Sequence, residues 1–307
     1  MVNESPPRGE GCGPKGRIWR VVVVVFVVEG EGERVVKRVR VFVCESKSKS
    51  LARWRMDALE RASDETPGSD HAGWFARECD DETFTRAMGA RDDDGRSALH
   101  RACARGRRGA ATARAILERC GEGEQGRALW DVKALVRQTD EGDWTPLHTS
   151  ASVGDAETAA ALARCGAKVD ARTPGGQTPG HYAVSKGHLD VLEVLANAGA
   201  DMTATDNVGA TLLHRASGQG RLGVLDFLME RLSPTAELSK EARRALEARD
   251  NGGRTALLVA CEAGQEEAAI RLARHGADVE AKDADKRGVA ELAPKLVSML
   301  KQIAAER

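Results

Sequence analysis

The sequence predicts an all-α solenoid built from stacked helix-turn-helix units, and three features in one register predict it. The first is a tetrapeptide that recurs at 33-residue spacing: T-P-L-H at 145–148, T-P-G-H at 178–181 and T-L-L-H at 211–214. The second is a glycine nine residues after the threonine of each repeat: Gly154, Gly187, Gly220 and Gly264. The third is a set of apolar residues at helical spacing in the following segment, such as Val191, Leu192, Val194 and Leu195.

Each residue type in the repeat has a structural reason to stand where it does. Thr145 is a good N-cap because its hydroxyl accepts a bond from a free backbone N–H, and Pro146 is tolerated in the first helical turn. Gly154 ends this first helix in a left-handed conformation, and Gly199 ends the second helix of the next repeat in the same way. The turn residues at 206–209 then predict a loop, or finger, between repeats.

Five clear repeats and two caps follow from this register. The repeats begin near residues 92, 140, 173, 206 and 250, with weaker tetrapeptides at 97–100 and 255–258. We predict a repeat domain over 51–307, with a degenerate N-terminal cap over 51–90 and a polar C-terminal cap over 283–307. Insertions at 121–130 and 233–245 follow a second helix, where added residues lie on the surface, and the second insertion looks helical itself.

Residues 1–50 are predicted to be a separate appendage. The apolar run at 21–28 is too short to cross a membrane, and the acidic segment at 29–33 is unlike a signal-peptide cleavage site. This run, the acidic glycine turn and the β-branched run at 35–43 predict a hairpin, and a disordered segment is the alternative. We therefore expect neither a membrane span nor secretion.

Composition argues against several classes of function. The chain has 46 Lys+Arg and 47 Asp+Glu residues, and this balance is unlike that of a general nucleic-acid binder. Its seven cysteines are scattered without a C-x-x-C pair, which predicts reduced, mostly buried thiols and no zinc site. We expect a monomeric protein of the cytoplasm and nucleus.

No catalytic or cofactor site is predicted. The segment at 121–126 matches G-x-G-x-x-G, but it follows a helix and carries two glutamates that would repel a phosphate. No base is placed to activate Cys103 or Cys165. The histidines at one register position are expected to bond the neighbouring turn and join repeat to repeat: His100, His148, His181 and His214. We predict a protein that is not an enzyme and holds no cofactor or metal.

A cluster of arginines near the first repeat has two interpretations. One is a solvated helix end, and the other is a docking patch for an acidic partner surface; no aromatic stacking platform accompanies the cluster to favour nucleic acid. Its members are Arg96, Arg101, Arg105, Arg107 and Arg108.

The 33-residue unit with its T-P-L-H signature resembles the ankyrin-repeat family. Within that family the chain looks most like gankyrin-like proteins, the proteasome non-ATPase regulatory subunit 10. The resemblance runs from about Arg91 to Ile303 and is carried by D-D-D-G-R-S-A-L-H-R-A-C at 92–103, D-W-T-P-L-H-T-S-A-S-V-G at 143–154 and H-R-A-S at 214–217. It implies an ankyrin solenoid that acts as an assembly chaperone of the proteasome regulatory particle.

The resemblance also implies a partner and a surface. Gankyrin-like proteins hold the C-terminal domain of one ATPase subunit on the concave face and block its docking until assembly is complete. Large aromatic residues are the best anchors among the implied partner-binding residues. These are Asp94, Arg96, Arg101, Asp143, Trp144, Arg172, Tyr182, Lys186 and Arg215.

The chain also departs from the gankyrin pattern. Gln219 stands where a basic residue is expected after the H-R-A-S element, and the segment at 258–262 has the wrong spacing for the retinoblastoma-binding L-x-C-x-E motif. The competing hypothesis is a general ankyrin scaffold, or a ubiquitin-ligase substrate adaptor in signalling, that shares only the repeat frame.

Overall fold

The structure, a computed structural model, describes residues 19–30, 33–44, 84–85, 88–121, 131–233 and 239–306. The chain divides into two compact units, Met1–Thr66 and Pro67–Arg307, and each is described here by itself. The predicted N-terminal cap over 51–90 and the insertion at 121–130 lie almost wholly outside the described residues. The boundary predicted near residue 50 therefore stays a prediction.

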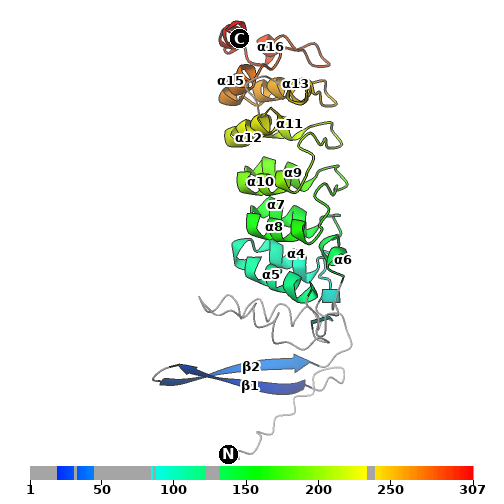
Figure 1. Cartoon of the computed structure of the whole chain (residues 1–307), viewed down its shortest axis with the longest axis vertical. Coiled ribbons are helices and arrows are strands. Elements are labelled where there is room, and N and C mark those ends of the chain that lie inside the picture. The colour runs from blue at the N-terminus through cyan, green and yellow to red at the C-terminus, as the bar shows by residue number, and fades with distance from the viewer. Residues whose placement is uncertain are drawn as a thin grey trace, which may run out of the picture. The chain divides into compact units, whose positions relative to one another are not determined.

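The first unit contains the predicted hairpin. Strands β1 (Trp19–Gly30) and β2 (Glu33–Cys44) pair antiparallel, with Trp19 opposite Cys44 and Gly30 opposite Glu33 (Figure 1). The β-branched runs favour this pairing. This pairing corresponds to the hairpin that the sequence offers for the appendage.

The second unit is a stack of helix pairs that follow one another in chain order (Figure 1). The first helices of successive repeats pack together, as do the second helices. The first-helix row is α4 (Ala98–Ala104), α7 (Pro146–Val153), α9 (Pro179–Lys186), α11 (Leu212–Gly218), α14 (Ala256–Glu262) and α16 (Val289–Leu292). The second-helix row is α5 (Arg107–Gly121), α8 (Ala156–Arg164), α10 (Leu189–Asn197), α12 (Leu222–Leu232), α15 (Glu266–Arg274) and α17 (Val297–Ala305).

The residues that predicted the repeat set the helix ends. The Thr145 hydroxyl accepts from the His148 N–H at the start of α7, with Pro146 as the first helical residue. Gly154 ends α7 with φ 86°, and Gly187 ends α9 with φ 81°, the left-handed geometry expected of these glycines. The helices are short, and their buried faces form one continuous core only because neighbouring repeats cover them.

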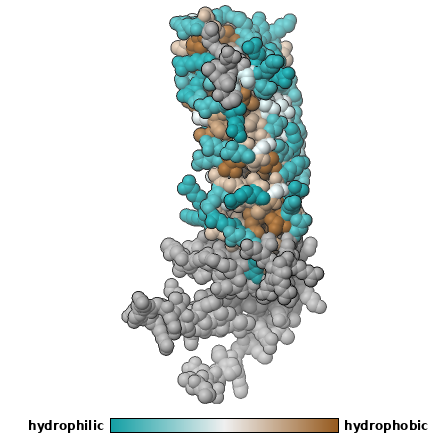
Figure 2. Space-filling view, in the orientation of Figure 1, coloured by the Kyte–Doolittle hydropathy of each residue, from teal (hydrophilic) through white to brown (hydrophobic). Residues whose placement is uncertain are grey.

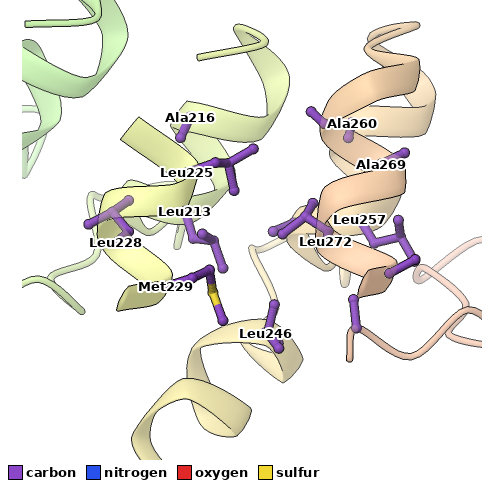
Figure 3. Packing of buried hydrophobic residues seen from close by; sticks show 14 of the residues in the cluster. Leu213, Ala216, Leu225, Leu228, Met229, Leu246, Leu257, Ala260, Ala269 and Leu272 are labelled. Carbon is purple, nitrogen blue, oxygen red and sulfur yellow. The ribbon is translucent and has the colours of Figure 1, made fainter. Parts of the chain in front are cut away.

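Two helices lie outside the regular rows. Helix α6 (Val132–Val136) begins after Asp131, whose side chain accepts from the N–H groups of Lys133 and Ala134. Helix α13 (Lys240–Glu247) confirms the helical prediction for the second insertion. In Figure 3, Leu246 of α13 and Met229 of α12 approach each other below the helices of the fourth and fifth repeats. The insertion therefore contributes to the hydrophobic core and does not lie only on the surface. The face seen in Figure 2 shows hydrophobic residues along the repeat stack, bordered by hydrophilic ones.

In the part of the chain that the structure describes, six fingers project from the stack, one before each first helix. In every finger the first residue donates its backbone N–H to the carbonyl of the fifth, at 3.0–3.1 Å. They span residues 92–96, 140–144, 173–177, 206–210, 250–254 and 283–287. The predicted C-terminal cap thus has the full layout of a repeat, with a sixth finger and the helices α16 and α17. One side of this cap is apolar, with Leu296 and Leu300 buried.

Neighbouring fingers are joined by backbone bonds, with one interruption. The second residue of a finger donates its N–H to the third residue of the preceding finger: Glu141 to Asp94, Asn207 to Gly175, Asn251 to Val208 and Ala284 to Gly252, at 2.9–3.0 Å. In the third finger this donor position is Pro174, which has no N–H. We call the junction between the second and third fingers the Pro174 seam.

Arginines brace alternate pairs of fingers. Arg91 Nη1 donates to the Gly95 carbonyl in its own finger (2.7 Å) and to the Thr139 carbonyl at the base of the next (2.9 Å). Arg172 does the same with Gly176 and Thr205, at 3.3 and 2.7 Å. Arg249 follows the same pattern and donates to the carbonyl oxygens of Gly253 and Lys282. The six fingers therefore form three braced pairs.

Candidate functional site

Four histidines form a ladder that joins the repeats, as the sequence predicts. The Nε2 atoms of His100, His148, His181 and His214 lie 2.9, 3.3, 3.3 and 2.9 Å from the carbonyl oxygens of Trp144, Gln177, Ala210 and Arg254 in the next finger. Each Nδ1 accepts the backbone N–H of the Ser or Thr N-cap of its own helix, at 3.1–3.3 Å. This geometry requires a neutral ring that carries its proton on Nε2.

Burial lowers the pKa of all four histidines and outweighs the carbonyl contacts that would raise it. The pKa of His148 falls to about 4. Among the described residues, no group of three or more His, Cys, Asp and Glu side chains is placed to hold a metal ion. The ladder is therefore part of the scaffold.

The described cysteines are buried or half-buried free thiols. Cys103, Cys120 and Cys261 are buried, and Cys165 is half-buried. Burial raises the pKa of Cys120 and Cys261 to about 11 and raises that of Cys103 further. These thiols lack the low pKa of a nucleophile.

An aromatic cluster lies where the second finger meets the first helices. The ring centroids of Trp144, on the finger, and Tyr182, on α9, are 4.4 Å apart and tilted by 53°. His148 of α7 meets the edge of Tyr182 at 5.8 Å. Trp144 and Tyr182 are both half-buried. Sequence reasoning singled out these two as anchors, and the fold brings them together from different repeats.

Charged candidates lie on the repeats either side of this cluster. Arg96 Nη1 lies 3.1 Å from Asp94, and its Nε lies 3.8 Å from Asp140 of the next finger. Arg215 pairs with the buried carboxylate of Asp206 in its own repeat, so it also braces its finger. Burial opposes ionisation of Asp206, but Arg215 and backbone N–H groups outweigh it and lower its pKa.

The remaining candidates divide between the first helices and the Pro174 seam. Arg101 on α4 is half-buried, and Lys186 in the last turn of α9 is exposed. Asp143 and Arg172 line one hollow together. Partner binding by any of the nine candidates stays a prediction.

The predicted arginine cluster is spread over two helix ends. Arg105 is the C-cap of α4, while Arg107 and Arg108 open α5 and are exposed. This agrees with a helix end facing solvent and leaves the docking interpretation untested.

Two further groups of charged residues escaped sequence reasoning. Arg254 bonds Asp250 and Glu262, and Arg287 lies 3.8 Å from the same Glu262, so the last two fingers share one charge network. Arg137 and Lys168 line the hollow at the Pro174 seam. Aligning the fingers by position would have marked the arginines that recur there, but it would not have predicted the hollow.

Comparison with known proteins agrees with the repeat architecture. The family model for ankyrin repeats (three copies) matches residues 124–206 and again residues 199–283, together slightly more than half of the chain. The search of curated proteins found no match. Within the described residues, no helix combines the length and apolar character needed to cross a membrane. The chain therefore belongs to the ankyrin-repeat family, whose stacked units serve as protein-binding scaffolds.

Proposed function

We propose that this protein is a non-catalytic assembly chaperone of the proteasome regulatory particle, which binds the C-terminal domain of one ATPase subunit with its fingers and first helices. It would act as a monomer in the cytoplasm and nucleus. While bound, it would prevent that subunit from docking fully. The sequence resemblance at 92–103, 143–154 and 214–217 points to this class of partner.

The aromatic cluster is the observation that carries the binding surface. Trp144 and Tyr182 present two large rings side by side at the junction of a finger and a first helix. Half-buried aromatic residues supply much of the binding energy of protein interfaces, because they bury large area at low entropic cost. Ankyrin-repeat proteins present finger tips and first helices to their partners, and this cluster lies on those two elements.

Cations around the cluster favour an acidic partner surface. Arg96 and Arg101 belong to the preceding repeat, Lys186 lies on α9 with Tyr182, and Arg215 belongs to the following repeat. Arg96 and Arg215 are already paired with carboxylates, so an acidic partner would share or replace those pairs. Such charges tune association rate and orientation, while the aromatic rings supply affinity.

The test is direct titration with a panel of purified proteasomal ATPase C-terminal domains. One domain should bind, and Trp144→Ala should cost about 2 kcal/mol of binding free energy if the ring is a central anchor. Val208→Ala is the matched control, because Val208 is a 57% exposed apolar residue on another finger. Circular dichroism checks that each variant keeps its helices.

Charge reversal tests the contribution of the cations around the aromatic cluster. Arg96→Glu should weaken the complex by about 1–3 kcal/mol if the contact is desolvated, whereas Arg164→Glu, exposed at the end of α8, should leave affinity unchanged. Binding to none of the ATPase domains overturns the proposal. Co-purification of an unrelated partner without proteasome subunits would instead support a signalling scaffold or a ubiquitin-ligase substrate adaptor.

A further inference from the structure

A hollow of about 380 Å³ lies at the Pro174 seam. It is lined by residues from the bases of the second and third fingers, among them Arg137, Asp143, Lys168 and Arg172. Its position coincides with the one place where the described finger row lacks a backbone bond between neighbours.

Three sequence features account for the weak joint between these two fingers. Pro174 removes the N–H that would bond the preceding finger. Thr139 stands where Arg91 and Arg172 brace other pairs, so this junction lacks that brace. The Thr173 hydroxyl is buried and has no hydrogen-bond partner among the described residues. A buried hydroxyl is thus left unsatisfied at this seam, which is unusual in a folded protein.

The three cations of the hollow differ from the arginines in and beside the other fingers that form ion pairs. The finger arginines Arg96, Arg215, Arg254 and Arg287 all pair with carboxylates. By contrast, none of Arg137, Lys168 and Arg172 forms an ion pair with a carboxylate of the described residues. Arg137 Nε donates to the Gly166 carbonyl at 3.0 Å and Arg172 Nη1 to two carbonyls, so both guanidinium groups are held in place with other N–H groups to spare.

Asp143, which lines the hollow, has a strained backbone conformation. Its φ is 57°, whereas four other fingers place glycine at this position, with φ between 70° and 74°. A left-handed conformation disfavours a non-glycine residue, and such strain tends to persist where a side chain has a use. Its single carboxylate leaves the lining with three cations and one anion.

We propose that this hollow binds a carboxylate side chain of an acidic peptide segment. Arg137, Lys168 and Arg172 would hold the carboxylate, and Asp143 would accept the peptide N–H beside it. Asp143 disfavours a compact, doubly charged phosphate, because its carboxylate repels two negative charges more strongly than one. This inference rests on the proposed function in one respect, namely that the ligand is a segment of a partner protein.

The test uses the full chain, labelled with ¹⁵N, and acetylated hexaglutamate amide at low ionic strength. Saturable shifts of the Gly142, Asp143 and Arg172 amides are expected. The double variant Arg137→Glu/Lys168→Glu should weaken binding about tenfold, which two exposed pairs can supply. Asp143→Asn keeps an acceptor oxygen and removes the negative charge, so affinity should rise.

Arg243→Glu/Arg244→Glu is the matched control, since both arginines are exposed on α13 and the change of charge is the same. Unchanged hexaglutamate affinity in the Arg137→Glu/Lys168→Glu variant overturns the proposal. Binding of inorganic phosphate at the same amides without hexaglutamate binding would identify a phosphate site and also overturns the proposal. A preference for hexalysine over hexaglutamate overturns it as well. The Trp144→Ala titration with ATPase domains is independent of this outcome, so the two proposals can fail separately.

Discussion

Acidification is expected to destabilise the repeat domain through its buried histidines. In an unfolded chain, histidine titrates near 6.5, whereas burial lowers the pKa of His148 to about 4. Below pH 6.5 the unfolded state therefore binds a proton that the folded state does not. The stabilisation is complete above pH 6.5 and is lost as the pH falls toward 4.

The magnitude follows from these two pKa values. Between pH 7.5 and 5.5, His148 alone lowers the unfolding free energy by about 1.3 kcal/mol. The pKa values of His100, His181 and His214 are shifted the same way, so they add to the loss. Asp206 has a pKa below its ordinary 3.8 and stays ionised throughout this range.

Urea unfolding followed by circular dichroism at 222 nm, at both pH values, measures the effect. His148→Leu is the matched variant, because the fifth repeat carries Leu258 at this register position and buries it fully. This variant should be less stable at pH 7.5, where it lacks two hydrogen bonds, but its stability should change less with pH. Equal stability of the unaltered protein at both pH values, or an undiminished pH dependence in the variant, would refute the reasoning.

Three other predictions concern strain, core packing and thiol reactivity. Asp143→Gly should stabilise the domain by about 1 kcal/mol in thermal unfolding, because it relieves the left-handed strain; Glu141→Gly, in the same finger but without positive φ, should not. Leu246→Ala should cost about 2–5 kcal/mol in urea unfolding, because Leu246 is only 2% exposed and joins α13 to the core; a loss below 1 kcal/mol would mean that α13 packs loosely. In timed alkylation with peptide mapping, Cys165 should react before Cys103, which is buried and has the higher thiol pKa; the reverse order would contradict the burial assigned to them.

The repeat frame could be read from the sequence because each marker has a local cause. A threonine hydroxyl caps a helix and a glycine ends one within a few residues, so Thr145 and Gly154 define a helix without knowledge of the fold. The histidine ladder was predictable for the same reason, since His148 returns to its own N-cap while it contacts the next finger. Helix α13 followed from its helix-forming composition.

The sixth repeat was harder to see because it uses different chemistry. Gly288 stands where the other repeats have Thr or Ser, so the tetrapeptide is missing. Glu291 takes the place of histidine, and its carboxylate accepts the Gly288 N–H at 2.8 Å, as histidine Nδ1 does elsewhere. The polar pattern read as a cap, although the backbone repeats the finger geometry.

The seam and the hollow depend on contacts between fingers about 33 residues apart. Pro174 is an ordinary turn residue in its own finger, and its effect appears only when the neighbouring finger is placed beside it. Arg137 and Lys168 likewise belong to different repeats. Trp144 and Tyr182 were recognised as candidates by residue type, but their ring contact required the stacked structure.

The alternating arginine braces constrain how this stack can be lengthened or shortened. Arg91, Arg172 and Arg249 each reach forward to the next finger, and threonine occupies the intervening positions at 139 and 205. Excising one interior repeat would place arginine, or threonine, at this position before two successive fingers. The excision would therefore change which fingers are joined by an arginine. An engineer who wishes to preserve the existing ties should therefore duplicate or delete repeats in twos.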